Sequence, residues 1–338
     1  MKQAGPLVFL LSLGVVLGGC SKIPPARSEF VLGTVCTVNL YRGGTAALYG
    51  DIFARLRDLE GLMSSNAADT EVARINQNAG IAPVKAGEEV IRVLSAALHY
   101  AELSGGTFDP TVGPLVKLWG IGTEQARIPA EEEIRGALDL VNWREVIVNR
   151  EAGTVFLPKP GMGIDLGAIA KGYAADQAAE LIKKAGISGA LIDLGGNIYA
   201  LGTKGEGKPW RIAVQDPLDV RGAYIGVLEL GEKSVVTSGV YERFLEAEDR
   251  RYHHILSTAD GYPADTGLLS VTVIADTSMD ADALSTVLFV LGYGEGRILA
   301  DSLENIEALF VLQDLSIRGT PGALENFTLV NDQYRIVR

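Results

Sequence analysis

The order of helical and strand patterns along the chain is the feature that most limits its fold. Helical spacing dominates before residue 140 and strands dominate after residue 190, so the two do not alternate strictly. This order predicts an α+β fold, with mixed sheets and packed helices, rather than a doubly wound sheet. Residues 64–78 are polar and irregular, and residues 110–122, around Trp119, are predicted to form a loop. The predicted helices are 46–63, 90–104, 130–140, 168–185 and 280–291, and the predicted strands are 30–41, 146–148, 155–157, 190–194, 210–214, 224–230, 251–256 and 271–274.

Composition and charge narrow the function classes. The 338 residues are 47% hydrophobic and 21% charged, which is typical of a globular protein with a large core. The net charge of −12 and the lack of a Lys/Arg cluster in the sequence argue against a nucleic-acid partner, because a phosphate backbone requires a basic face. An acidic protein can bind a polyanion only where a cation or backbone dipoles neutralise the charge locally. A nucleotide ligand would therefore point to a bound metal ion.

The N-terminus is predicted to be a targeting segment, with residues 1–19 as a signal peptide. Its apolar run, Leu7 to Leu17, is too short to span a bilayer. Leu17-Gly18-Gly19-Cys20 resembles a bacterial lipobox, which implies lipidation of Cys20; a plain secretory peptide is the alternative. Residues 20–28 would be a lipidated tether and residues 29–338 the folded domain. With Cys20 used as the anchor, Cys36 is the one cysteine left in the sequence, so no intramolecular disulfide is expected, and Cys36 is predicted to be a core residue.

The predicted helix at 280–291 carries a carboxylate and two hydroxyl groups on one face. Asp282, Ser285 and Thr286 are three and four residues apart, so their side chains lie together, while leucines and valines form the opposite, core-facing side. Oxygen ligands of this kind suit Mg²⁺, which keeps several positions for water or phosphate oxygens. A solvated face outside the core, with an acidic residue near the helix start, is the equally weighted alternative.

A glycine-rich segment, Gly161 to Tyr173, forms a turn that leads into the predicted helix at 168–185 and includes Gly172. Free N–H groups at a helix start favour anions, which suggests a phosphate site. The third glycine comes one residue too late for a dinucleotide fingerprint, which disfavours a nicotinamide-dependent oxidoreductase. The glycines could equally serve close packing of the helix against the sheet.

Neighbouring histidines, His253 and His254, occur in the predicted strand 251–256. Because adjacent side chains in a strand point to opposite faces, only one of them can face a given site. A single histidine beside a metal-bearing pocket could act as a general base. The third histidine, His99, lies within a predicted amphipathic helix and is the weakest candidate; a hydrogen-bonded structural histidine is the alternative for each.

Eight short segments occur in a fixed order along the mature chain. They are Leu32-Gly33-Thr34, residues 62–65 with Asn76, Gly105 to Gly120, Asp165 to Tyr173, Asp193 to Asn197, Thr237-Ser238-Gly239, His254-Ile255-Leu256 and Asp282 to Thr286. This ordered set resembles the ApbE family of FAD:protein FMN transferases over nearly the whole mature chain. The resemblance implies a mixed α+β architecture related to the tunnelling fold, with FAD bound in a cleft together with Mg²⁺.

The resemblance also assigns roles to residues. It implies that Asp282 and Thr286 bind the metal through their side chains, Ala168 through its carbonyl group, and Ser285 as a further ligand. It implies that His254 is the catalytic base. The FAD contacts that it implies are Leu32, Asn66, Gly105, Gly106, Thr107, Asp165, Lys171 and Leu256. Two positions depart from the family pattern, since Leu32 replaces a methionine and Asn66 stands near where many members have an aromatic residue.

The implied reaction transfers FMN from FAD to a Ser or Thr hydroxyl of an acceptor protein and releases AMP. The implied acceptor is a subunit of a membrane redox complex, which an exported enzyme anchored on the periplasmic side could reach. The rival interpretations are a flavin-carrier lipoprotein, an FAD pyrophosphatase that uses water as acceptor, and a structural interaction module. The last leaves the Asp282 helix face and the glycine turn unexplained.

Overall fold

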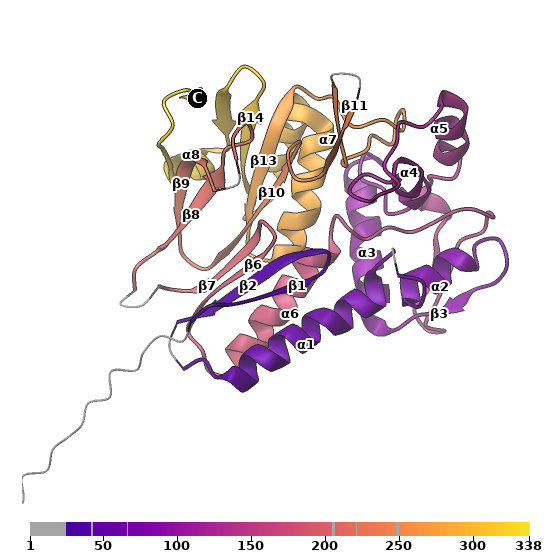
Figure 1. Ribbon diagram of the computed structural model, residues 1–338, viewed down its shortest axis with the longest axis horizontal. Coiled ribbons are helices and arrows are strands. Elements are labelled where there is room, and N and C mark those ends of the chain that lie inside the picture. The colour runs from indigo at the N-terminus through magenta and orange to yellow at the C-terminus, as the bar shows by residue number, and fades with distance from the viewer. Residues whose placement is uncertain (1–24, 42, 66, 205–206, 221, 248–249) are drawn as a thin grey trace, which may run out of the picture.

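The structure is a computed structural model that describes residues 25–338 except 42, 66, 205–206, 221 and 248–249 (Figure 1). Cys20 and Asn66 therefore lie outside the described residues. The helices are α1 (Ala46–Met63), α2 (Glu71–Gln77), α3 (Glu88–Leu103), α4 (Gly113–Trp119), α5 (Glu131–Leu138), α6 (Ala170–Lys184), α7 (Ser278–Ser302) and α8 (Pro321–Glu325), with a 3₁₀ turn at Trp143–Glu145. The predicted α+β class is confirmed.

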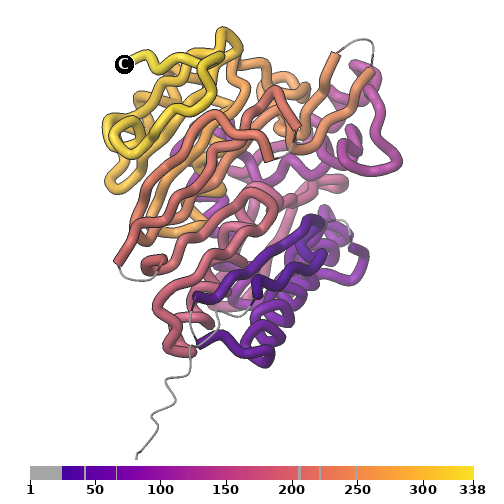
Figure 2. The backbone as a smooth tube through the Cα atoms, turned by 60° about the vertical axis from the view of Figure 1, so that its left-hand side comes forward, coloured from indigo at the N-terminus to yellow at the C-terminus, as the bar shows by residue number. Residues whose placement is uncertain are grey.

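A nine-stranded sheet forms the centre of the fold. Its strands run in the order β1 (Arg27–Val31), β2 (Thr34–Leu40), β6 (Gly189–Leu194), β7 (Asn197–Gly202), β10 (Lys233–Gly239), β13 (Leu268–Ala275), β14 (Glu307–Leu312), β15 (Ser316–Gly319) and β17 (Arg335–Ile336). All neighbours are antiparallel except β15 and β17. Figure 2 shows the β1–β2 hairpin and the C-terminal strands at opposite edges of this sheet.

Three smaller sheets complete the fold. They are β16 (Phe327–Leu329), β9 (Tyr224–Leu230) and β8 (Trp210–Gln215); β3 (Val84–Lys85), β5 (Thr154–Phe156) and β4 (Ile147–Asn149); and the hairpin β11 (Phe244–Ala247) with β12 (Arg250–His253).

Side chains of the large sheet divide between two cores. Val236, Val271 and Val273 belong to the core shared with α1, α3, α6 and α7, whereas Val235 and Ile274 belong to a second core. Strand residues alternate between the two faces of a sheet, which explains why neighbours in sequence belong to different cores. The second core contains Trp210 and Phe327, so the β16–β9–β8 sheet covers the face opposite the helices.

Several predicted elements differ from the observed ones. The strand predicted at 30–41 is a hairpin that turns at Leu32 and Gly33, both with positive φ of 57° and 67°. The predicted tether ends earlier, because β1 begins at Arg27. Residues 64–78 and 110–122 were expected to be irregular, yet they contain α2 and α4; Gly120 ends α4 in the left-handed conformation.

Helix α7 is the longest helix within the described part of the chain, and it breaks at Gly292, where φ is 73° and ψ is 177°. Its length and apolar composition would also allow it to cross a membrane, but half of its most apolar stretch is buried within the fold. It packs on α6, β10 and β13, which identifies it as a core helix (Figure 1). The predicted helix 280–291 corresponds to the part before the break.

Candidate active site

The first turns of α6 and α7 meet at Gly172. A Cβ atom at this position would lie 2.2 Å from the carbonyl oxygen of Ser278, so only glycine permits this approach. The Gly172 N–H donates to Oδ2 of Asp282 at 2.8 Å, across the contact. The glycine therefore serves close packing, as one interpretation of the sequence proposed, but against a helix rather than against the sheet.

Asp282 is 3% exposed, and its two carboxylate oxygens have different neighbours. Oδ2 accepts the Gly172 N–H, while Oδ1 lies 3.6 Å from Nζ of Lys171. Lys171 Nζ also donates to the carbonyl oxygen of Gly167 at 3.4 Å. Oδ1 is thus the oxygen that faces a long cationic side chain, where a metal ion could also bind.

The two hydroxyl residues that follow Asp282 lie beside it, as predicted. Ser285 is completely buried, its Oγ donates to the carbonyl oxygen of Asp282 at 2.8 Å, and it also lies 2.8 Å from Oγ of Ser238. Ser238 Oγ lies 3.4 Å from Oγ1 of Thr286, which is half-buried. The expectation of a face outside the core is wrong, because α6 and β10 cover it.

Ser238 was absent from the predicted site residues, although it belongs to the segment Thr237-Ser238-Gly239 that supported the resemblance. Its position on β10 directs its hydroxyl to α7, and this pairing joins residues nearly fifty positions apart. Sequence spacing alone cannot reveal such a contact.

The oxygen atoms around Asp282 fit a hard cation that completes its coordination with water or with oxygens of a bound ligand. Among the described residues, no group of three or more His, Cys, Asp or Glu side chains could hold a metal ion. Asp282 supplies one carboxylate, and Ser285, Thr286 and Ser238 supply hydroxyl oxygens. Mg²⁺ is commonly bound by one or two carboxylates plus water and phosphate oxygens, whereas a zinc site needs more protein ligands. Ala168 lies two residues before α6 and is half-buried, and its carbonyl group could add to this set.

Asp165 is held rigidly in the loop before α6. Its Oδ2 accepts from Ser65 Oγ at 2.6 Å, and its Oδ1 accepts the Gly167 N–H at 2.8 Å. Asn76 fixes the same loop through two bonds to the backbone of Ile164, at 2.6 and 2.9 Å. These bonds give the Asn76 segment of the resemblance a structural role.

The loop 105–107, predicted to contact FAD, is hydrogen-bonded to the segment that follows β12. Thr258 Oγ1 donates to the carbonyl oxygen of Gly106 at 2.7 Å. The chain continues from this loop to Pro110, whose carbonyl oxygen accepts the Asp165 N–H at 2.8 Å. The loop that carries Gly105–Thr107 and the loop that carries Asp165, before α6, are therefore neighbours. Leu256, also predicted to contact FAD, is buried in a small core with Trp119.

The strand predicted at 251–256 ends at His253, so His254 lies just outside β12, and the two histidines have different environments. His253 is buried, with Nε2 3.0 Å from the carbonyl oxygen of Ala264 and its ring edge against Phe289, so it has a structural role. His254 Nδ1 lies 3.3 Å from the carbonyl oxygen of Arg243. A carbonyl oxygen only accepts, so Nδ1 carries the hydrogen and Nε2 keeps the lone pair that a general base needs.

Burial and two nearby cations, Arg243 and then Lys171, lower the pKa of His254 to about 3. The imidazole is therefore neutral at pH 7 in the free protein. The exposed guanidinium of Arg243 donates to the carbonyl oxygen of Gly33 at 3.2 Å, next to Leu32 at the hairpin tip. Arg243, which sequence reasoning missed, thus links the hairpin to the His254 segment.

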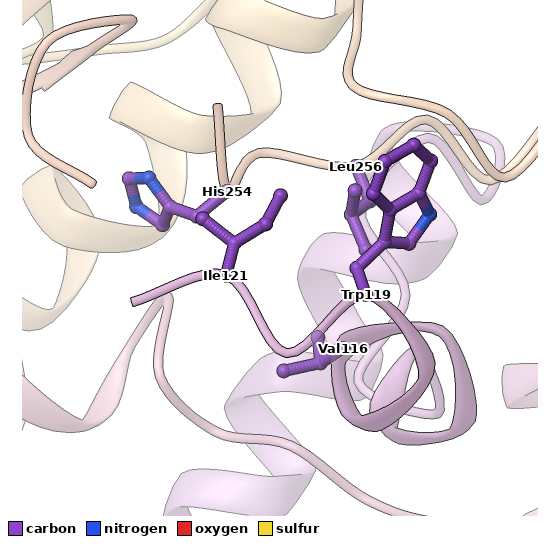
Figure 3. A pocket seen from close by; sticks show the side chains of 5 residues that line it. All are labelled: Val116, Trp119, Ile121, His254 and Leu256. Atoms are coloured by element: carbon purple, nitrogen blue, oxygen red, sulfur yellow. The ribbon is translucent and has the colours of Figure 1, made fainter. Parts of the chain in front are cut away.

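A cavity of about 20 Å³ lies between α4 with the loop after it and the segment His254–Leu256 (Figure 3). It is lined by Val116, Trp119, Ile121, His254 and Leu256, and the imidazole of His254 turns away from the indole of Trp119. A cavity of this size holds about one water molecule, so a flavin ring would require these walls to separate.

Comparison with known proteins gives one consistent result. The ApbE family profile matches residues 32–310. An FAD:protein FMN transferase of Treponema pallidum is 36% identical, covering 99% of this chain and 98% of the relative, and one of Escherichia coli K12 is 34% identical, covering 84% and 86%. The crystal structure of the ApbE protein from Thermotoga maritima superposes with a TM-score of 0.82 at 33% identity, covering 89% of this chain and 98% of its own. The apo flavinyl transferase ApbE of Pseudomonas stutzeri gives 0.78 at 31% identity, covering 91% and 98%.

Proposed function

The chain belongs to the ApbE family and transfers FMN from FAD to an acceptor protein, and we propose that Mg²⁺ assists this transfer to a Ser or Thr hydroxyl. The observation that supports the metal is the buried carboxylate of Asp282 near the start of a helix, with the hydroxyl residues Ser285 and Thr286 on the same helix face and Ser238 in contact with both. A pyrophosphate bound there needs a cation, because the net charge of the chain is −12.

Different residues of the site would bind the metal ion and the phosphates of FAD. Asp282, Ser285 and Thr286, with the carbonyl group of Ala168, would hold the metal ion. When bound, Mg²⁺ would offset the negative charge that develops on the leaving AMP. Lys171 would add a second positive charge near the phosphates, because its ammonium group lies 3.6 Å from Oδ1 of Asp282. Phosphoryl transfer depends mainly on positioning and charge neutralisation, which this arrangement supplies.

His254 would take the proton of the acceptor hydroxyl. The hydroxyl oxygen attacks the phosphorus on the FMN side, a new O–P bond forms, and the bond from that phosphorus to the bridging oxygen breaks, so that AMP leaves with the bridging oxygen. The proton goes to Nε2, which is unprotonated because Nδ1 faces the carbonyl oxygen of Arg243. Phosphates bound near Arg243 and Lys171 would weaken the repulsion that lowers the pKa of His254, and so would make it a stronger base.

Covalent flavin on the acceptor tests the function. The protein is incubated with FAD, Mg²⁺ and an acceptor domain from a membrane redox complex, and intact-mass spectrometry follows the acceptor while chromatography follows AMP. Transfer predicts an acceptor heavier by one FMN group and an equal amount of AMP. Free FMN with an unmodified acceptor would instead indicate a pyrophosphatase, and unchanged FAD would indicate a carrier.

We also propose that the protein is exported and anchored on the periplasmic side through lipidated Cys20, which lies outside the described residues. The lipobox-like segment and the need to reach a membrane-bound acceptor support this location. Labelled palmitate should be incorporated into the wild-type protein and not into a Cys20→Ser variant. Equal labelling of the two would refute lipidation at this residue.

A further inference from the structure

Helices α6 and α7 each provide a carboxylate that accepts hydrogen bonds from backbone N–H groups at the start of the other helix. Asp282 of α7 accepts the N–H of Gly172, at the start of α6. In return, Asp176 of α6 accepts the N–H of Ser278 at 2.7 Å and that of Met279 at 2.9 Å, at the start of α7. Each carboxylate lies four residues beyond a backbone N–H that the other helix binds, and thus one turn further along its own helix.

These reciprocal hydrogen bonds satisfy backbone groups that a helix cannot satisfy itself. The first N–H groups of a helix have no partner within it, and the helix start attracts negative charge. A carboxylate bound to N–H groups makes a charge-assisted bond, which is stronger than a bond between neutral groups. The two pairs therefore act in the same direction, holding each helix start against a turn of the other.

Other contacts leave the start of α7 little freedom to move. Ser278 is completely buried, and its Oγ donates to Oδ1 of Asn197 at 2.5 Å and accepts from Ser234 Oγ at 2.9 Å. Gly172 lets the two backbones approach without an intervening side chain. The Asp176 and Asp282 bonds therefore act together with these contacts to set the offset between α6 and α7.

We propose that Asp176 is a positioning residue that orients the metal-binding oxygen of Asp282; this rests on the proposed function. Asp282 has one carboxylate oxygen bound to α6, so the direction of the other oxygen depends on where α6 lies relative to α7. Asp176 sets that relation from the opposite side without lying among the metal ligands. A shift between the helices would turn Oδ1 away from the cation while leaving the ligand set complete.

The competing explanation is that Asp176 only stabilises the start of α7. Thr277 provides the matched control, because it is the ordinary N-cap of the same helix and its Oγ1 accepts the N–H of Asp280 at 3.2 Å. Loss of a cap destabilises a helix by roughly 1 kcal/mol. Thr277→Ala removes a cap from α7 but leaves the link to α6 intact.

The experiment measures binding of Mn²⁺ to the FAD complex by electron paramagnetic resonance, together with thermal unfolding, for the wild type, D176N and T277A. The side chain in D176N keeps one oxygen and turns an amide group toward the second N–H, so one bond to α7 is lost. We expect the dissociation constant for Mn²⁺ to rise about tenfold in D176N and less than twofold in T277A, although both lower the unfolding temperature. D176E, which keeps the charge, should recover part of the loss.

Equal Mn²⁺ affinity in D176N and T277A would overturn the inference. Should D176N not fold, D176E decides in its place, since an affinity equal to that of the wild type would show that the position of the carboxylate does not matter. FMN transfer by the wild type is measured in parallel. Wild-type protein that binds Mn²⁺ without transferring FMN contradicts the proposed function alone, whereas wild-type protein that does not bind Mn²⁺ overturns both proposals.

Discussion

Replacing Gly172 with alanine tests whether the close approach of α6 and α7 builds the metal site. The added methyl group would lie 2.2 Å from the Ser278 carbonyl oxygen and 2.7 Å from Cα of Met279, both backbone atoms. Non-bonded carbon and oxygen atoms rarely come closer than about 3 Å, so the helices must separate by about 1 Å. That movement stretches the 2.8 Å bond from Gly172 to Asp282.

Two opposing effects set the stability of G172A. Alanine in a helix is favoured over glycine by about 1 kcal/mol. Overpacking costs about 1–3 kcal/mol, and a weakened hydrogen bond to a carboxylate costs about 1.5–3 kcal/mol. We therefore expect a net destabilisation of about 1.5–5 kcal/mol. Because a misplacement of about 1 Å can lower a rate about a hundredfold, FMN transfer should fall by a similar factor.

The assay compares G172A with G294A, by urea unfolding and by the transfer reaction. Gly294 lies in α7, and a Cβ atom added there would meet no neighbouring atom within 4 Å, so alanine should be tolerated and should stabilise the helix slightly. A G172A protein with wild-type stability and wild-type transfer would refute the argument. A loss of stability without loss of transfer would show that the helix contact supports the fold and not the site.

Three further outcomes follow from the same contacts. D282N should abolish Mg²⁺-dependent transfer and destabilise the protein by about 2–4 kcal/mol, because Asp282 is buried and bound to Gly172. As a control, D301N, at an exposed position of the same helix, should change the free energy of unfolding by less than about 1 kcal/mol. Chelation by EDTA should stop transfer and leave circular dichroism unchanged, since Asp282 keeps its bond to Gly172 without a metal; added Mg²⁺ should restore transfer, and lasting transfer in EDTA would exclude the metal. The pKa of His254 is lowered in the folded protein, so below about pH 6.5 the unfolded chain binds a proton there that the folded protein does not. The free energy of unfolding therefore falls as the pH drops from about 6.5 toward 3, by the contribution of this one group. H254Q should therefore lose about 2 kcal/mol less than the wild type between pH 8 and pH 5 in thermal unfolding, and parallel pH curves would contradict this.

Local spacing was enough to predict several parts of the fold. The helix at 46–63 was predicted with the observed bounds, because its apolar residues recur every three to four positions. The same rule placed Asp282, Ser285 and Thr286 side by side, since residues three and four apart share a helix face whatever surrounds it. Helices α2 and α4 were missed because they have only seven residues each, too few for a periodic pattern to emerge.

The surroundings of the site were decided by contacts between distant segments. The sequence could not tell that the Asp282 face is buried, because burial depends on α6 and β10, which are distant in the chain. Ser238 and Arg243 reach the site only because β10 and the hairpin β11–β12 pack beside it.

The sequence by itself determined which side chains share a helix face, where glycines mark turns, and which ordered segments resemble a known family. Tertiary structure alone decided that one carboxylate oxygen of Asp282 binds Gly172 while the other lies near Lys171. It also decided that Asp176 binds the start of α7 from the neighbouring helix. The physical reason is that periodicity sets angles within one helix. The distance between two helices depends on close packing at Gly172, which no local pattern encodes.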